Sequence, residues 1–131
     1  MAGKVRIGFV GVGAMGQAAH LRNYATVDGC EVVALAELRE QTGRRVAARY
    51  GVPSVYPSAS EMLEAGELDA VVASQPFSRH GQVLQELIPF GLPIFIEKPL
   101  AGSVDVGMQI VDAAAKHGTK IMVGYHKRSD P

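Results

Sequence analysis

The segment that decides the fold reads Val5-Arg6-Ile7-Gly8-Phe9-Val10-Gly11-Val12-Gly13-Ala14-Met15-Gly16. Its first half is apolar enough for a buried strand. Its second half carries the spacing Gly-x-Gly-x-x-Gly and leads into a helix-like stretch. Glu37 follows Gly16 by 21 positions and ends the next apolar run. A strand, three glycines, a helix and an acid about 20 residues further on form the pattern that binds a dinucleotide. The alternative is a glycine-rich turn of an α/β domain that binds no ligand.

Each glycine of this motif has a separate expected role. Gly11 allows the tight turn out of the strand, Gly13 lets the backbone approach a pyrophosphate, and Gly16 lets the helix lie close to the sheet. A helix starting near Ala14 would point its unpaired N–H groups and positive dipole end at the phosphates. We therefore expect Ala14 and Met15 to belong to the cofactor-binding loop as well.

Length, charge and cysteine content exclude several classes of function. The chain has 131 residues, of which 47% are apolar and 20% charged, as in one globular domain. Thirteen basic and thirteen acidic residues cancel, so we expect neither a nucleic-acid partner nor a membrane surface as partner. No apolar stretch approaches the length of a membrane span. Cys30 is the single cysteine, so we expect no internal disulfide, no metal site and a reducing cytoplasmic setting.

Apolar runs alternate with helix-like segments along the chain, which is typical of a parallel sheet with crossover helices. Strands are predicted at 5–10, 31–36, 54–56, 69–74, 94–96 and 120–124, and helices at 14–27, 40–50, 58–64, 77–90 and 103–117. The sequence thus predicts an α/β fold, a doubly wound six-stranded Rossmann sheet of order 3-2-1-4-5-6. Its ligand crevice should lie at the carboxyl ends of the first and fourth strands.

Local patterns specify helix ends and faces. Ser58 and Glu61 have the spacing of a capping box, Ser103 is a second expected N-cap, and Gly118 is an expected C-cap. Apolar residues at helical spacing in the first and last helices are Ala14, Ala18, Leu21 and Ala25, and Met108, Val111, Ala114 and Ala115.

A second group of functional residues follows the fifth strand, where the chain reads Glu97-Lys98-Pro99. A charged pair at the end of a buried strand is costly unless the charges reach water, each other or a ligand. Pro99 stiffens the loop that carries Lys98. Taken alone, Lys98 would be interpreted as an exposed lysine at a strand end.

These motifs together resemble the glucose–fructose oxidoreductase / inositol dehydrogenase family. The resemblance rests on the glycine motif at 11–16, on Pro76 and His80, on Glu97-Lys98-Pro99, and on Val123-Gly124-Tyr125-His126-Lys127-Arg128. It covers nearly the whole chain but only the N-terminal, NAD-binding domain of that family. Residues 1–124 would be this domain, and residues 125–131 the start of a C-terminal substrate domain.

The resemblance implies roles for individual residues. Glu37 matches the acid that binds the adenosine ribose, Pro76 borders the nicotinamide half of the cofactor, and Lys98 positions substrate and assists proton movement. A lysine suits that work because burial and nearby cations lower its pKa. The predicted cofactor-binding residues are Gly11, Gly13, Ala14, Met15, Gly16, Glu37, Arg39, Ser74, Pro76, Glu97 and Lys98, and Lys98 is the predicted catalytic residue.

The expected cofactor is NAD rather than NADP, because the charge of Glu37 repels a 2′-phosphate. Arg39 could instead reach that phosphate or stack on the adenine. His80 is interpreted as a structural residue of the helix start, with contact to a ligand as the alternative. The family often has an asparagine where this chain has His126, which is either a surface residue or a substrate contact. Arg128 matches a position that is frequently basic.

The resemblance implies an NAD-dependent oxidoreductase acting on a sugar, polyol or inositol hydroxyl. In this family a second α/β domain after the sixth strand supplies most of the substrate pocket, so we expect this chain alone to be inactive. The parent protein is expected to be a homo-oligomer. The alternative is a stand-alone NAD-binding module, used for redox sensing or as a partner subunit, without catalysis of its own.

Overall fold

Six parallel strands form one sheet at the centre of the computed structural model, which describes residues 3–13 and 16–131. The strand order is β3-β2-β1-β4-β5-β6, and every neighbouring pair is parallel. The doubly wound order predicted from the sequence is therefore confirmed. The strands are β1 Val5–Val10, β2 Cys30–Ala36, β3 Ser54–Tyr56, β4 Ala70–Ala73, β5 Ile94–Ile96 and β6 Ile121–Val123.

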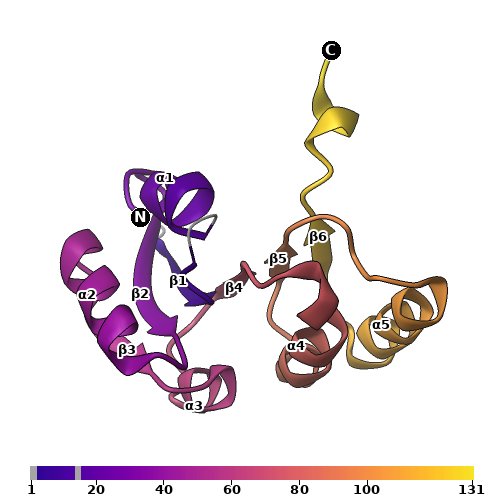
Figure 1. The fold of residues 1–131 in the computed structure, drawn as a ribbon, viewed down its shortest axis with the longest axis horizontal. Helices are drawn as coiled ribbons and strands as arrows, with labels where there is room; N and C mark the ends of the chain where they lie inside the picture. Colours follow the sequence, from indigo (N-terminus) through magenta and orange to yellow (C-terminus); the bar gives the residue numbers. More distant parts are fainter. Residues whose placement is uncertain (1–2, 14–15) are drawn as a thin grey trace.

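Helical segments connect successive strands (Figure 1). The α-helices are α1 Arg22–Tyr24, α2 Glu40–Tyr50, α3 Ala59–Glu64, α4 His80–Leu87 and α5 Val104–His117. A π-helical turn at Gly16–Leu21 leads into α1, and 3₁₀ turns lie at Phe77–Arg79, Ile88–Phe90 and His126–Ser129. None of the described helices is long and apolar enough to cross a membrane.

Two apolar cores cover the two faces of the sheet. One joins β1 and β2 to the first helical segment and α2 through buried residues that include Phe9, Leu21 and Val46. The other packs α3, α4 and α5 against the sheet and includes Met62, Leu84 and Ile110. In Figure 1, α3, α4 and α5 follow the lower side of the sheet, and α1 lies above it. Strands buried on both sides explain the continuous apolar runs in the sequence.

The order of strands reverses at β1, which pairs with β2 on one side and with β4 on the other. Val10 is aligned with Ala36 of β2 and with Ala73 of β4, so the three strands end at the same level. The Gly11 N–H donates to Ala36 O at 3.0 Å, and the Ser74 N–H donates to Val10 O at 2.9 Å. The loops that follow the three strands are therefore neighbours along one edge.

The first helix ends earlier than its sequence pattern indicates. Helical structure stops at Tyr24 instead of Val27, because the backbone N–H and hydroxyl of Thr26 both donate to Asn23 O, at 3.0 and 2.9 Å. Leu21 is fully buried as its spacing predicts, but Ala25 is exposed, so its expected place on the buried face is wrong. Ala14 and the side chain of Ala18 lie outside the described part of the structure, so the expectations for these two residues are not tested.

The last helix has the predicted extent, but only part of its apolar repeat lies on the buried face. Ala114 packs against the core. Met108 and Val111 are about half exposed, at 54% and 51%, whereas Ile110 is buried. The repeat identified a helix correctly, but these two side chains have no packing partner on the sheet. The predicted caps are confirmed: Ser58 accepts from the Glu61 N–H, and Gly118 adopts a left-handed conformation at the end of the helix.

Ser103 offers a direct test of how α5 is held. Its side chain accepts a hydrogen bond from the Val106 N–H at 3.3 Å, which satisfies one of the free N–H groups of the first turn. Ser103→Ala should lower the free energy of unfolding by about 1 kcal/mol, measured by urea denaturation. Ser78→Ala, at an exposed position without a cap, is the matched control and should change it far less. Equal effects of the two substitutions would contradict the capping role.

Candidate functional site

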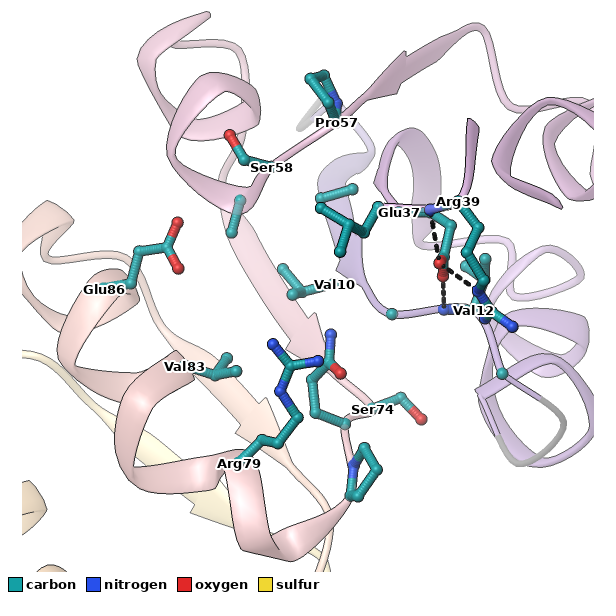
Figure 2. Close-up of a pocket in the computed structure, with 17 residues that line it drawn as sticks. Val10, Val12, Glu37, Arg39, Pro57, Ser58, Ser74, Arg79, Val83 and Glu86 are labelled. Atoms are coloured by element: carbon teal, nitrogen blue, oxygen red, sulfur yellow. Dashed lines mark hydrogen bonds and ion pairs between the residues drawn. The ribbon is translucent and has the colours of Figure 1, made fainter. Parts of the chain in front are cut away.

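A cleft of about 480 Å³ opens at the carboxyl ends of β1, β2 and β4 (Figure 2). It lies where the strand order reverses, which is where α/β sheets bind ligands. Of the residues predicted from the sequence, those that line it are Gly11, Gly13, Glu37, Arg39, Ser74 and Pro76. Ala14 and Met15 lie outside the described residues.

Two of the three glycines in the loop lie where a side chain would be strained or crowded. Gly11 has φ +83°, and a Cβ there would lie 2.8 Å from Gln75 Nε2. A Cβ on Gly16 would lie 3.0 Å from both Gly11 O and Ser74 Oγ. At Gly13 a Cβ would meet no described atom within 4 Å, so this glycine faces open space. The loop is thus closely packed against the end of β4 but open at Gly13, which fits a backbone approached by a pyrophosphate.

Glu37 ties the glycine loop to the end of β2. Glu37 is only 8% exposed to solvent. Oε2 accepts from the Val12 N–H at 3.2 Å, while Oε1 accepts from the Arg39 N–H at 3.1 Å and from Arg39 Nε at 2.8 Å. Figure 2 shows these three interactions as dashed lines at one wall of the cleft. The carboxylate is therefore held in place by donors of the protein itself.

The protonation of Glu37 is decided by two opposing effects. Burial raises the pKa of the carboxyl, but the hydrogen bonds from Arg39 and Val12 and the charge of Arg39 lower it by more. The pKa of Glu37 therefore lies below the ordinary value of a glutamate, and the side chain is ionised at neutral pH. An ionised carboxylate can accept hydrogen bonds from both hydroxyls of a ribose.

Arg39 lies at the exposed rim of the cleft, whereas its partner Glu37 is buried. Its side chain is 64% exposed and reaches back to Glu37 at the rim of the cleft. A guanidinium in this position partly neutralises the carboxylate and remains accessible to a ligand. The interaction at an exposed arginine contributes little to stability, so its main effect is to orient Glu37.

The wall of the cleft opposite the glycine loop was not predicted from the sequence. Apolar groups of Leu38, Pro57, Ala59 and Val83 line it. Arg79 also lines it, and Figure 2 shows its side chain reaching into the cleft from the 3₁₀ turn that precedes α4. These residues come from the ends of β2 and β3 and from α3 and α4, so only the tertiary fold brings them together. The only sequence signal for this wall was that Leu38 and Pro57 come just after predicted strands, whose carboxyl ends border the expected crevice.

Glu97 and Lys98 follow β5 and do not line this cleft. Glu97 Oε1 lies 2.7 Å from His20 Nε2, and Glu97 Oε2 accepts from the Lys98 N–H at 3.1 Å. The His20 ring also meets Phe95 edge to face, with 5.4 Å between ring centroids. Lys98 itself is exposed. The carboxylate of Glu97 thus connects the first helical segment to the backbone of Lys98.

His20 is the clearest residue that sequence reasoning missed. It lies 77 residues before Glu97, and no local pattern pairs the two.

His80, predicted to belong to a helix start, is the first residue of α4 and is fully buried. Tyr125 is partly exposed, and its hydroxyl oxygen accepts from the Leu100 N–H at 3.4 Å. His126 and Arg128 lie exposed in the last 3₁₀ turn.

The fold agrees with what comparison with known proteins finds. A family model described as an oxidoreductase family with an NAD-binding Rossmann fold matches residues 5–125. The inositol 2-dehydrogenase of Acidothermus cellulolyticus is 34% identical over 129 residues, which are 97% of this chain and 38% of that protein. An inositol 2-dehydrogenase/D-chiro-inositol 3-dehydrogenase of Shouchella clausii is 33% identical over 96% of the chain and 37% of its own length.

Solved structures show the same similarity. Scyllo-inositol dehydrogenase from Lactobacillus casei, with bound NAD(H) and scyllo-inositol, superposes with a TM-score of 0.87 at 25% identity over 97% of this chain and 38% of that one. The WlbA dehydrogenase from Bordetella pertussis, in complex with NADH and UDP-GlcNAcA, gives 0.87 at 26% identity over 97% and 36%. The chain thus spans less than two fifths of the length of these relatives.

The contacts of Glu37 predict a pH dependence of stability. A carboxyl whose pKa is lowered on folding stabilises the folded state above its unfolded pKa, and this contribution is lost as the pH falls through the folded pKa. Between about pH 5 and pH 3, the free energy of unfolding should therefore fall less steeply for Glu37→Gln than for the wild type. Urea denaturation at each pH measures this. Glu40→Gln, at an exposed carboxylate, controls for the loss of one charge; an unchanged slope in Glu37→Gln would refute the assignment.

Proposed function

We propose, since the chain belongs to the oxidoreductase family with the NAD-binding Rossmann fold, that it is the cofactor domain of a dehydrogenase acting on a sugar, polyol or inositol hydroxyl. The family resemblance inferred from the sequence motifs is confirmed by the match over residues 5–125. NAD is the cofactor of this fold in the family. The activity on a polyol is our inference from relatives that are inositol dehydrogenases.

The observation that carries this proposal is the placing of the glycine loop between Glu37 and Ser74. Gly13 leaves open space above the loop, while Gly11 and Gly16 hold the loop against the ends of β2 and β4. These features fit a dinucleotide that lies across the sheet with its pyrophosphate over the loop. Glu37 is already oriented and ionised on the adenosine side.

Each group has a proposed task in the reaction. Gly11, Gly13 and Gly16, with Ala14 and Met15, form the pyrophosphate loop, Glu37 binds the ribose hydroxyls, and Pro76 borders the nicotinamide half. NAD, when bound, accepts the hydride. The Lys98 Nζ then holds the substrate hydroxyl and carries its proton, while Glu97 fixes the Lys98 backbone. Arg39 and Ser74 complete the proposed set of cofactor contacts.

The charge of Glu37 supports NAD as the preferred cofactor over NADP. Its ionised carboxylate sits where the ribose hydroxyls are expected, and it would repel a 2′-phosphate. Arg39 limits this preference, because a guanidinium is a good phosphate ligand and its side chain is largely exposed. We propose that the interaction with Glu37 keeps Arg39 from serving as a 2′-phosphate site.

Substrate recognition is proposed to need a second domain, for which residues 125–131 would be the beginning. The chain matches only 38% of the length of its inositol dehydrogenase relatives, and Lys98 is exposed rather than enclosed by a pocket. Holding a reacting alcohol in place can supply about 7–11 kcal/mol of barrier reduction, so we propose that residues 1–131 bind cofactor without turnover. A homo-oligomeric, cytoplasmic enzyme remains part of the proposal. The dehydrogenase relatives favour catalysis over a stand-alone binding module.

The pyrophosphate assignment is tested at Gly13. Gly13→Val puts a branched side chain into the open space where the pyrophosphate should approach. NAD(H) affinity, measured by calorimetry, should fall by at least about tenfold, or 1.4 kcal/mol. Gly29→Val, at another glycine with open space around it, is the matched control. Wild-type affinity in a folded Gly13→Val variant would rule out this loop as the phosphate site.

The two ends of the cofactor are tested by a pair of substitutions. Glu37→Ala removes the ribose acceptor and should weaken NAD(H) binding by about tenfold. Lys98→Ala should leave the affinity within about twofold of wild type, because the amine acts on the substrate and in the transition state. Both affinities are measured by calorimetry on the same chain. Loss of binding in Lys98→Ala with normal binding in Glu37→Ala would reverse the proposed cofactor orientation.

A further inference from the structure

His80 connects the two loops on the side of the cleft where Lys98 lies. The ring is fully buried at the first residue of α4. Its Nδ1 lies 2.8 Å from Pro99 O and 3.2 Å from Leu100 O, and its Nε2 lies 3.1 Å from Gln75 O. One ring nitrogen therefore faces the loop after Lys98, and the other faces the loop after β4.

All three partners of the His80 ring are backbone carbonyl oxygens, which can only accept hydrogen bonds. A neutral imidazole has one N–H donor and one lone pair, so it can bond to one of the two loops but points its lone pair at a carbonyl of the other. An imidazolium donates from both nitrogens and satisfies both loops. The connection between the loops is thus complete only in the protonated ring.

No carboxylate among the described residues forms an ion pair with His80. The ionisable side chains on the segments around the ring are Arg79, Glu97, Lys98 and Asp105. Glu97 is engaged by His20 and the Lys98 N–H, and Arg79 lines the cleft. A positive ring at this buried position would therefore have no carboxylate partner among the described residues, and the three carbonyl dipoles are the groups that face its charge.

We propose that His80 is a positioning residue for Lys98, and that its protonated ring fastens the Pro99–Leu100 segment to the loop of Gln75. Lys98 is bonded covalently to Pro99, and its own N–H is fixed by Glu97. The backbone of Lys98 is therefore held on both sides, by His80 after it and by Glu97 before it. When the ring loses its proton, one of the two loops is released and Lys98 is held less firmly relative to Pro76.

This inference rests on the proposed function only for the role of Lys98. The hydrogen bonds of His80 to the two loops can be tested without cofactor. In the isotope-labelled chain, NMR spectra that correlate ring nitrogens and ring protons report the protonation of His80 as the pH is varied. Both nitrogens should carry a proton at the acidic end of the folded range. As the ring deprotonates, the backbone amides of one loop, either Gln75 and Phe77 or Leu100 and Ala101, should shift with the same midpoint.

Two results of this titration would overturn the proposal. One is a neutral ring with a single tautomer over the whole pH range in which the chain is folded. The other is a ring that titrates while the amides of both loops stay unchanged. His117, exposed at the end of α5, serves as the internal comparison, because its titration should move neither loop.

A substitution tests the consequence for Lys98. His80→Gln offers donors from one nitrogen only, so it can hold at most one loop. The shift of the Lys98 side-chain Cε signal on adding NADH should fall by about half or more in His80→Gln and stay unchanged in the control His117→Gln. A wild-type response in His80→Gln would refute the positioning role. If His80→Gln does not fold, the NMR titration of the wild-type chain alone tests whether the protonated ring holds both loops. Absence of any NADH response in the wild type would count against the proposed function and leave the titration result standing.

Discussion

The parallel pairing of β1 with both β2 and β4 is the constraint on which the rest of the site depends. Val10 is level with Ala36 and Ala73, so the chain leaves all three strands at one edge. The connections after β1 and β4 then diverge to opposite faces of the sheet, an arrangement that leaves a crevice between them. The glycine loop occupies this point, where a Cβ on Gly16 would lie only 3.0 Å from Ser74 Oγ and would force that neighbour to shift. A cleft at this edge is thus a consequence of strand order.

Within that cleft, Glu37 has a structural role in addition to the binding role that we propose for it. A buried carboxylate without partners would be costly, but the Val12 and Arg39 donors keep Glu37 ionised. The same bonds fasten the glycine loop to the end of β2. A ribose that binds here therefore meets an acceptor that is already charged and oriented, so little ordering has to accompany binding. The acid about 20 residues after the glycines is thus also part of the architecture that positions them.

Sequence patterns predicted those features that depend on neighbours along the chain. All six strands appear within one residue of their expected bounds, since each apolar run is flanked by polar or turn residues. Two predictions failed for different reasons. The first helix ends early through a local turn, in which Thr26 donates to Asn23 O. Met108 stays exposed because the tertiary packing of the last helix buries Ile110 instead. The interaction of His20 with Glu97 spans 77 residues and has no local signal. The apolar wall of the cleft was missed for the same reason.

The two sides of the sheet, on either side of the point where the strand order reverses, differ in how fully they enclose a ligand. On the side of β2, the cleft is walled and Glu37 is buried. On the side of β5, the backbone around Lys98 is fixed through Glu97 and Pro99, but the lysine side chain is exposed. The hydrogen-bonded backbone fixes the position from which the Lys98 side chain extends, but no pocket encloses its amine. If the proposed function holds, cofactor affinity and turnover should respond to different residues, because we propose that the first depends on the β2 side and the second on Lys98 together with groups that enclose the substrate.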